Sequence, residues 1–467
     1  MSEIFTRKWS EVSGGRFDPL YLLYGSQAFL KNTSFSIKTL GSVIQSIKTG
    51  FAAGKNDQSD FAKGIIQIRP TNLDENGILK FEKNIYIPKD VSSEHLIAKG
   101  EVLFNNTNSQ ELVGKTAYFD LEGDFVSSNH ITRIKTDTNQ LLPQYLSVLL
   151  NIYQKNKVFF NTCVNWNNQS GINVDFLKSY QIPLPTLPIQ QQIINIMDNA
   201  YKQKEIKEQQ AKEILDSIDS YLMQELGINL PNNDYASLGQ RIFTQKISHL
   251  SGTRFDPSYH QKYYQDLEKA LQCSSYPLVN LASTIEDFKK GIEVGSSEYS
   301  QSQEIPFIRV SDISNNGIDF DNVQKFISAS LYKNLKAFQA QENELLYSKD
   351  GTIGICLEVD TSRDYVISGG ILRLKLTQEV NKSFLRFLLA SSIMNILVNR
   401  QSIGAIIKHL NIDNFLNLKI PLPEIETQER IASEINKRRE RVKALQQEAK
   451  EILESAKKQA ENMILGG

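Results

Sequence analysis

The sequence predicts an α+β protein made of two copies of one segment. Each copy is an α+β domain followed by a long helix, and the two helices pair antiparallel. Three observations carry this prediction. The proline-punctuated strand Ile182-Pro183-Leu184-Pro185 recurs as Ile420-Pro421-Leu422-Pro423, an offset of 238 residues (420 minus 182). A Lys- and Glu-rich segment with a narrow apolar seam follows each copy. Short β-branched and aromatic runs split by Asn-Gly and Asp-Gly turns fill each half, and such runs are typical of strands and hairpins.

The two charged segments carry their apolar residues alternately three and four positions apart, which is the seam of a coiled coil. In the second segment the seam consists of Ile431, Ile435, Arg438, Val442, Leu445, Ala449, Ile452, Ala456, Gln459 and Met463. In the first it consists of Ile193, Met197, Ala200, Ala211, Ile214, Ile218 and Leu222, with Lys204 and Lys207 in the middle. Two surface helices, each packed on its own domain, are the alternative. A seam this narrow favours a partner helix, and the duplication supplies one.

The repeat also sets the expected domain boundaries. We expect the first α+β domain at residues 1–181, its strand and helix at 182–230, the second domain at 231–419, and its strand and helix at 420–467. Two copies in one chain can mimic a two-fold symmetric dimer, so the fold is predicted to be pseudo-two-fold symmetric. Duplex DNA with two half-sites is a common ligand of that symmetry.

Composition narrows the class of protein. A chain of 467 residues is too long for a single core, and its 40% hydrophobic and 22% charged residues are those of a soluble globular protein. No apolar run is long enough to cross a bilayer and the start lacks a signal-peptide core, so we expect a cytoplasmic protein with no membrane partner. The net charge of −1 means that DNA binding requires a local basic patch or the help of partners.

Motifs for catalysis are missing from the sequence. Gly114-Lys115-Thr116 resembles the end of a phosphate loop, but Ser109 stands where that loop needs Gly, so we interpret it as a turn between strands. The five histidines and three cysteines lack metal-ligand spacing. We find no dinucleotide fingerprint, no motif that holds a flipped adenine and no nuclease-type carboxylate set. The sequence therefore predicts a protein of recognition and assembly, not catalytic by itself and without cofactor or metal. An enzyme with degenerate motifs is the alternative.

The whole chain resembles the specificity subunit of Type I restriction–modification enzymes. The resemblance rests on the repeated order of an α+β domain, the Ile-Pro-Leu-Pro strand and a Gln-rich helix start. The two helix starts are Ile189-Gln190-Gln191-Gln192-Ile193 and Thr427-Gln428-Glu429-Arg430-Ile431. The repeated Arg-Phe-Asp-Pro segment also resembles the entry to the target recognition domains of that family.

The resemblance implies a function shared among several subunits. Each α+β domain would be a target recognition domain that reads one half of a split site in double-stranded DNA, and the paired helices would set the spacer. Two methyltransferase subunits would supply S-adenosylmethionine binding and adenine methylation with base flipping. Motor–nuclease subunits would supply ATP- and Mg-dependent translocation and cleavage. A protein–protein adaptor that has lost DNA specificity is the alternative.

Candidate DNA-binding residues are polar or basic residues on loops in matching places of the two halves, where they could reach base edges or phosphates. They are Lys48, Lys55, Arg69, Asn105, Asn106, Thr107, Lys289, Lys290, Arg309, Ser348, Lys349, Asp350, Lys408 and His409. We favour the triplets after Phe104 and Tyr347, because they differ between the halves as two different half-sites would require. For each single residue, a solvated loop side chain is the alternative.

Candidate docking residues for partner subunits lie in the repeated Arg-Phe-Asp-Pro segment near the start of each half. They are Arg16, Phe17 and Asp18, and in the second half Arg254, Phe255 and Asp256. Pairing of the Arg with the Asp, or capping of the local turn, is an equally good interpretation of these residues.

Overall fold

The computed structural model describes residues 19–60, 63–91, 93–167, 169–231, 257–401 and 409–466, together with residues 242, 244, 246 and 255. The chain divides into two compact units, which we call unit 1 (residues 1–208 and 446–467) and unit 2 (residues 209–445). Each unit contains one α+β domain and a part of both long helices, whereas the boundaries expected from the sequence kept each helix whole. Among the described helices, none carries an apolar stretch that could span a bilayer.

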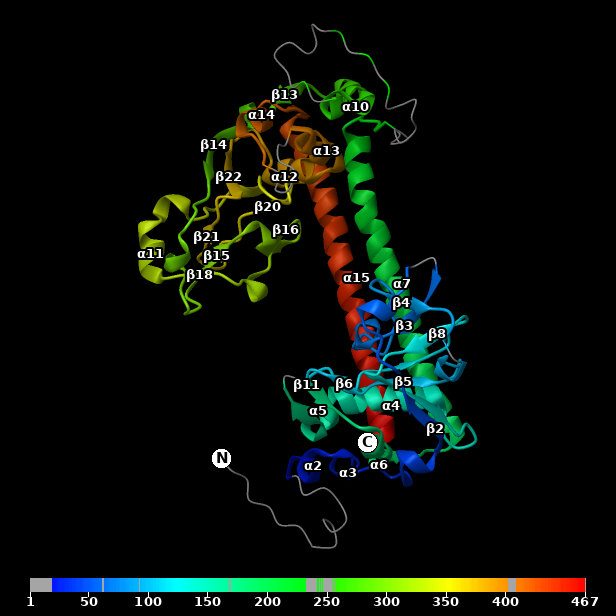
Figure 1. Cartoon of the computed structure of the whole chain (residues 1–467). Coiled ribbons are helices and arrows are strands. Elements are labelled where there is room, and N and C mark those ends of the chain that lie inside the picture. The colour runs from blue at the N-terminus through cyan, green and yellow to red at the C-terminus, as the bar shows by residue number, and fades with distance from the viewer. Residues whose placement is uncertain are drawn as a thin grey trace. The chain divides into compact units, whose positions relative to one another are not determined.

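The domain of unit 1 is made of short strands, with helix α4 packed on strands β5 and β7. Figure 1 shows α4 beside β5. The strands are β1 (Ile37–Thr39), β2 (Ile44–Thr49), β3 (Gly64–Ile68), β4 (Ile85–Pro88), β5 (Val102–Asn105), β6 (Thr107–Asn108), β7 (Thr116–Tyr118), β8 (Phe125–Ser127), β9 (Ile131–Thr136), β10 (Val164–Trp166), β11 (Gln169–Gly171) and β12 (Gln181–Pro183). The α-helices are α2 (Pro19–Tyr24), α3 (Ser26–Phe29), α4 (Pro143–Lys155), α5 (Val158–Thr162) and α6 (Val174–Ser179), and 3₁₀ turns are η1 (Leu40–Ser42), η2 (Lys55–Asp57), η4 (Pro70–Asn72) and η5 (Ser93–His95).

The domain of unit 2 repeats this plan. Its strands are β13 (Leu278–Asn280), β14 (Ile285–Lys290), β15 (Ile305–Ile308), β16 (Ile313–Ser314), β17 (Gly317–Ile318), β18 (Phe326–Ile327), β19 (Glu344–Ser348), β20 (Cys356–Glu358), β21 (Val366–Ile367), β22 (Ile371–Leu376) and β23 (Lys419–Pro421). Its α-helices are α10 (Lys262–Gln272), α11 (Ala329–Asn334), α12 (Lys382–Ala390), α13 (Ser392–Gln401) and α14 (Ile412–Leu416). Its 3₁₀ turns are η6 (Pro257–His260), η7 (Leu281–Thr284), η8 (Ser296–Glu298), η9 (Val310–Asp312), η10 (Phe320–Asn322) and η11 (Lys336–Phe338).

Strand order shows that the two domains are structural copies. The four-stranded antiparallel sheet β2-β9-β5-β7 of unit 1 corresponds to β14-β22-β19-β20 of unit 2. The three-stranded sheet β4-β3-β8 corresponds to β18-β15-β21, and in both sheets the last pair is parallel. The proline-punctuated strand pairs with an earlier strand in each half, as β1-β12 and β13-β23. The α+β class and the internal duplication predicted from the sequence are therefore confirmed.

Each domain has a large core and two smaller ones. The large core of unit 1 joins the four-stranded sheet and α4 to the long helices, and contains Phe104, Leu146, Ile193 and Leu453. A second core, which includes Ile68, Leu73 and Phe119, joins the three-stranded sheet to Leu103 and Ile131 of the four-stranded sheet. We call sheet β4-β3-β8 with this second core the small lobe of unit 1. Its counterpart in unit 2 is sheet β18-β15-β21 with a core that includes Ile308, Ile313 and Tyr365.

A buried glutamine ties the start of each long helix to its domain. The side-chain amide of Gln190 donates to the carbonyl oxygens of Pro185 and Gln140 at 2.9 and 2.8 Å. Its Oε1 accepts the backbone N–H of Leu142 at 2.8 Å. In unit 2, Gln428 makes the same three bonds with Pro423, Glu379 and Asn381. One buried glutamine in each Gln-rich helix start, Gln190 or Gln428, therefore has a structural role.

Replacing Gln190 by Ala should lower the free energy of unfolding by about 1–3 kcal/mol, because it leaves buried backbone groups without partners. Urea unfolding measures the loss. The neighbouring Gln191 is exposed and bonds only to Asn195 on its own helix, so Gln191→Ala should change the stability by less than about 0.5 kcal/mol. Equal losses in the two variants would contradict the structural role of Gln190.

The long helices α7 (Leu187–Glu225) and α15 (Ile425–Leu465) run antiparallel within each unit. In unit 2, Ser217 bonds to Arg438 at 3.1 Å, and further along α7 Glu225 pairs with Arg430 at 2.7 Å. In unit 1, Lys207 in the polar middle of α7 pairs with Glu448 at 2.6 Å. The lysine that interrupts the predicted seam is therefore matched by a carboxylate on the partner helix.

The seam predicted for the second helix is correct over its first part and wrong near its end. The buried positions there include Ile431, Ile435, Val442, Leu445 and Ala449, as predicted. Beyond them Ala456 is buried as predicted, but Leu453, Ala460 and Ile464 are buried in place of Ile452, Gln459 and Met463. A straight α-helix has 3.6 residues per turn, so its buried face drifts away from a strict 3.5-residue repeat.

Candidate nucleic-acid interface

One edge of the unit 1 domain brings together loops that are far apart in the sequence. We call residues 49–51, 106–108 and 128–130, with the hairpin of β10 and β11, edge 1. The backbone N–H of Asn129 donates to the carbonyl oxygen of Phe51 at 3.1 Å, and that of Asn106 donates to the carbonyl oxygen of His130 at 3.0 Å. The N–H of Ile172, just after β11, donates to the carbonyl oxygen of Asn106 at 2.9 Å.

Unit 2 has the same edge, built with different side chains. We call residues 290–292, 349–350, 368–370 and 409–410 edge 2. Gly369 N–H donates to the carbonyl oxygen of Ile292 at 3.0 Å, and Lys349 N–H donates to that of Gly370 at 2.8 Å. Leu410 N–H donates to the carbonyl oxygen of Lys349 at 2.9 Å. These bonds match those of edge 1 one by one, so the two edges share a single backbone framework.

Three of the favoured candidates are buried beneath these edges. Asn105 is fully buried and its amide donates to the carbonyl oxygen of Leu112 at 2.9 Å. The amide of Asn106 donates to Thr132 Oγ1 at 2.8 Å, and the hydroxyl of Ser348 donates to the carbonyl oxygen of Thr352 at 2.6 Å. A base edge could reach these groups only by displacing those bonds. The geometry therefore disfavours direct DNA contact by all three and gives them a role in shaping the loops.

Of the other members of the two triplets, Lys349 is also buried, whereas Thr107 and Asp350 are partly exposed. The hydroxyl of Thr107 donates to Asn106 Oδ1 at 2.7 Å. In edge 2, the carboxylate of Asp350 contacts two side chains. It lies 2.5 Å from the Nζ of the buried Lys349 and 2.8 Å from Nδ1 of His409. The side chain of His409 is 62% exposed, so it is the member of this set best placed to contact a ligand. Lys408 lies outside the described residues.

The six basic candidates on the strands and turns divide equally into exposed and engaged side chains. The side chains of Lys48, Lys55 and Lys290 are exposed and make no hydrogen bond or ion pair with the described part of the chain. The others hold the domain together. Arg69 donates to Gln67 Oε1 at 2.8 Å, Arg309 pairs with Asp312 at 3.3 Å, and Lys289 lies 4.9 Å from the ring centroid of Phe338. The three exposed lysines are therefore the candidates for phosphate contacts.

Reasoning from the sequence missed the hairpin of β10 and β11, which is the most exposed element of edge 1. All three residues of β10 are exposed, and the side chains of Val164 and Trp166 are 48% and 46% exposed. Trp166 lies close over Gly171, where an added Cβ would approach the indole to 2.5 Å. The sequence did contain a hairpin signal: Val164 and Trp166 flank Asn165, and the turn residue Asn167 follows them. In the structure Asn167 adopts a positive φ of 39°.

Polar groups without partners gather next to edge 1. The buried Asn105 Oδ1 and the hydroxyls of Ser127 and Ser128 have no hydrogen-bond partner in the described structure. Buried polar atoms of this kind are uncommon in folded proteins, where nearly all such groups have a partner. The turn above them reads Asn129-His130 in edge 1, where Asn129 is exposed, and Gly369-Gly370 in edge 2, where Gly369 is buried. The framework is thus shared while the groups offered to a ligand differ.

The candidate docking residues are mostly beyond what the structure describes. Arg16, Phe17, Asp18, Arg254 and Asp256 lie outside the described residues. Phe255 is described, and its side chain is 80% exposed, as a docking residue would require. The docking role of the segment stays a prediction.

The described residues contain no group of three or more His, Cys, Asp or Glu side chains that could hold a metal ion. Lys115, the lysine of the turn that resembles a phosphate loop, has a structural role. Lys115 is buried and donates to the carbonyl oxygens of Leu73 and Pro70 at 2.5 and 3.3 Å. Burial lowers the pKa of this lysine. The turn therefore binds the small lobe to the sheet.

These features define a class of protein in which a duplicated α+β recognition domain is carried on an antiparallel pair of long helices. Comparison with known families places the chain within it. The chain belongs to the type I restriction modification DNA specificity domain family, whose model matches residues 32–216 and 284–454.

The chain is also similar to individual proteins of known sequence or structure. The chain is 23% identical over 439 residues to the Methanocaldococcus jannaschii protein named "Putative type I restriction enzyme MjaX specificity subunit", with 93% of each chain covered. A chain from a structure on complex assembly and conformational transition of the type I restriction–modification system has the same fold, with a TM-score of 0.54, 16% identity, and 92% and 96% of the two chains covered. The type I S subunit from M. genitalium gives a TM-score of 0.45 at 13% identity, over 93% and 96% of the chains.

Proposed function

We propose that this chain is the DNA-recognition and assembly subunit of a type I restriction–modification complex, and that edges 1 and 2 each read one half of a bipartite site in duplex DNA. One observation carries the proposal. The two edges share the same backbone hydrogen bonds but offer different side chains, which is what two readers of different half-sites require. Family membership supports DNA specificity as the function of the repeated domain.

The exposed groups fall into two chemical classes. Lys48, Lys55 and Lys290 are suited to phosphates, because a lysine offers a point charge that attracts any sequence alike. Trp166, Asn129 and His409 are suited to bases, because amide and imidazole groups form directional hydrogen bonds and an indole can contact a thymine methyl or wedge into a base step. Basic residues would then hold the duplex while the variable residues read it.

Catalysis in the complex would belong to other subunits. Two methyltransferase subunits, one for each half, would bring S-adenosylmethionine and methylate adenine, and motor–nuclease subunits would bring ATP and Mg. The exposed Phe255, within the segment repeated at the start of each half, supports a docking role for that segment. Under this proposal the chain alone transfers no methyl group, so turnover of labelled S-adenosylmethionine by the purified chain would contradict it.

The proposal is tested by selecting duplexes from a random library with the full chain bound to its methyltransferase subunit. We expect two enriched half-sites separated by an unspecific spacer. We also expect an affinity that falls steeply with salt, because phosphate contacts release counterions. Equal binding of all duplexes would reject the reading role and favour an adaptor that only joins proteins.

Replacing Trp166 by Ala should weaken binding to the selected site about tenfold to a hundredfold, because it removes one specific base contact. The loss should fall on one half-site only. Fluorescence anisotropy with duplexes altered in either half measures this. Ile206→Ala is the matched control, since Ile206 is an equally exposed apolar residue on α7 of the same unit. A loss spread evenly over all sequences would show that Trp166 does not read bases.

A further inference from the structure

In unit 1, an Asn-Gly turn of the small lobe is held by both long helices. The hydroxyl of Tyr201 on α7 donates to the carbonyl oxygen of Asn76 at 2.5 Å. The Nζ of Lys457 on α15 donates to Asn76 Oδ1 at 2.7 Å. The turn itself is rigid, because Asp74 accepts the N–H of Asn76 at 2.8 Å and Gly77 adopts a positive φ of 78°. Burial raises the pKa of Tyr201, so its hydroxyl stays protonated and keeps donating.

Unit 2 holds the corresponding turn at the same position on the helix. The guanidinium of Arg439 on α15 donates to the carbonyl oxygen of Asn315 at 2.9 Å and to Asn316 Oδ1 at 3.2 Å. Arg386 on α12 donates to the same carbonyl oxygen at 2.8 Å. Arg439 stands 238 residues after Tyr201 (439 minus 201), the offset that relates the two helices. Both units therefore hold their Asn-Gly turn from the long helices, but unit 1 uses a tyrosine and a lysine and unit 2 uses an arginine.

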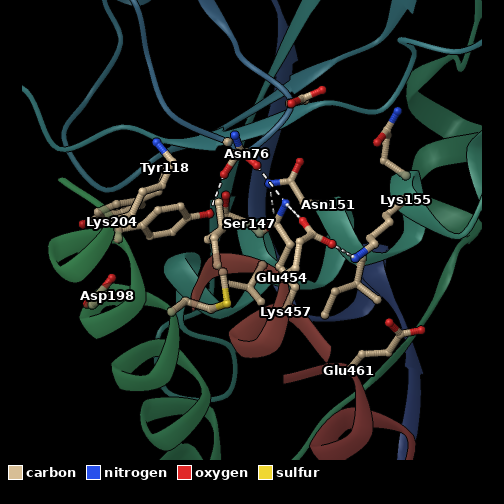
Figure 2. A pocket seen from close by; sticks show the side chains of 18 of the residues that line it. Asn76, Tyr118, Ser147, Asn151, Lys155, Asp198, Lys204, Glu454, Lys457 and Glu461 are labelled. Atoms are coloured by element: carbon tan, nitrogen blue, oxygen red, sulfur yellow. Dashed lines mark hydrogen bonds and ion pairs between the residues drawn. The ribbon is translucent and has the colours of Figure 1, made fainter. Parts of the chain in front are cut away.

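The surroundings of the turn also differ between the units. In unit 1 a cavity of ≈ 610 Å³ lies beside the turn, lined by residues that include Tyr118, Ser147 and Lys204 (Figure 2). In unit 2 the places of Tyr118 and Ser147 are taken by Glu358 and Arg386, which approach each other to 3.7 Å. In unit 1 the turn has this cavity on one side and packs against Thr116 and Asn151, since an added Cβ at Gly77 would approach Thr116 O and Asn151 Nδ2 to 2.7 and 2.6 Å. In unit 2 an added Cβ at Gly317 would meet no described atom within 4 Å.

The contacts of the turn matter because the small lobe carries part of the edge. The lobe is also joined to the four-stranded sheet, through the second core, which contains Leu103 of β5 and Ile131 of β9, and through Lys115. Residues 128–130 of edge 1 directly follow β8, and Ser128 N–H donates to the carbonyl oxygen of Ile68 on β3 at 2.9 Å. In unit 2, Ser368 makes the same bond to Ile308 at 2.8 Å. A tilt of either small lobe on its helices would therefore move half of the reading edge with it.

We infer that the Asn-Gly turn contacts fix the orientation of each small lobe on the helices of its own unit, and that Tyr201, Lys457 and Arg439 are positioning residues for DNA reading. This inference rests on the proposed function. Under this inference, these residues limit the range of spacer lengths that the protein accepts, because a lobe that tilts more freely accepts half-sites at more than one spacing. The inference does not assign them any contact with DNA.

The test uses the full chain with its methyltransferase subunit, and duplexes that carry both half-sites at every spacer length. For the double variant Tyr201→Phe with Lys457→Met, we expect the preference for the best spacer over its neighbours, one base pair longer or shorter, to fall about three- to tenfold, the effect of losing two hydrogen bonds. Arg439→Met in unit 2 should lower the same spacer preference by a similar factor. Lys457→Arg keeps a donor and should retain the wild-type preference, as should Glu205→Gln on the exposed face of α7.

Hydrogen exchange of the free chain provides a second readout that needs no DNA. Amides of residues 72–79 should exchange faster in the double variant, while those of α4 stay protected. Unchanged exchange, or faster exchange with an unchanged spacer preference, would overturn the inference. If the wild type selects no bipartite site at all, the proposed function fails, and the exchange experiment still shows whether the turn contact holds the lobe.

Discussion

Replacing Arg373 by Met should lower the free energy of unfolding of unit 2 by about 3–5 kcal/mol, the cost of stranding a buried charge. Arg373 on β22 donates to both carboxylate oxygens of Glu344 on β19, at 2.7 and 2.6 Å. Both residues are buried, with side chains 8% and 6% exposed. Without the guanidinium, the carboxylate has to stay charged without its partner or take up a proton. Urea-dependent proteolysis, followed on peptides of β19 and β22, measures the change.

A neighbouring ion pair provides the control. Lys375 lies two residues along the same strand and pairs with Glu286 at 2.6 Å, with both side chains more than half exposed. Lys375→Met should therefore cost about 0–1 kcal/mol. Adding Glu344→Gln to Arg373→Met should restore part of the lost stability, because no charge is then buried. Equal losses for Arg373→Met and Lys375→Met would show that burial of charge does not account for the effect.

Inserting seven residues into each long helix should lengthen the spacer between the two half-sites by about three base pairs. Two helical turns add about 10 Å to a helix, and base pairs stack about 3.4 Å apart. The register defines where to insert: after Glu208 in α7 and after Leu445 in α15, because Lys207 pairs with Glu448 on one side and Ala211 packs with Leu445 on the other. Selection from the spacer library measures the new preference.

A single insertion is the control for the paired one. Seven residues added to α15 alone would keep the pairing on one side of the insertion and shift it on the other, so binding to any bipartite site should fall. Both half-sites themselves should stay unchanged in the paired variant, because edges 1 and 2 are untouched. An unaltered spacer in the paired variant would show that the helices do not set the spacing.

The repeat and the types of element could be predicted from the sequence, because they depend on local patterns. Proline-punctuated strands, Asn-Gly turns and helical seams recur at matching positions, and the structure confirms α7 and α15 as single long helices of 39 and 41 residues. The end of the second seam was predicted wrongly. There the drift of a 3.6-residue helix, which no single heptad reveals, decides which side is buried.

The candidate site was predictable only in outline. The loops after Phe104 and Tyr347 do lie at corresponding edges, but β5 and β19 are inner strands of four-stranded sheets. Residues just after an inner strand are enclosed by its neighbours, which is why Asn105 and Ser348 are buried. Trp166 was overlooked because its hairpin joins the edge through β6, a pairing between segments about sixty residues apart.

From its amino-acid sequence alone this chain is identified as a duplicated α+β protein with paired charged helices and no recognisable catalytic motif. Repeats, periodic patterns and motifs are properties of residues that are near one another along the chain. Which polar residues reach the surface, and which residues hold the small lobe to the helices, depends on contacts between distant segments. The contact between Asn76, Tyr201 and Lys457 joins three distant segments, and such a contact exists only after the sheets and helices have packed.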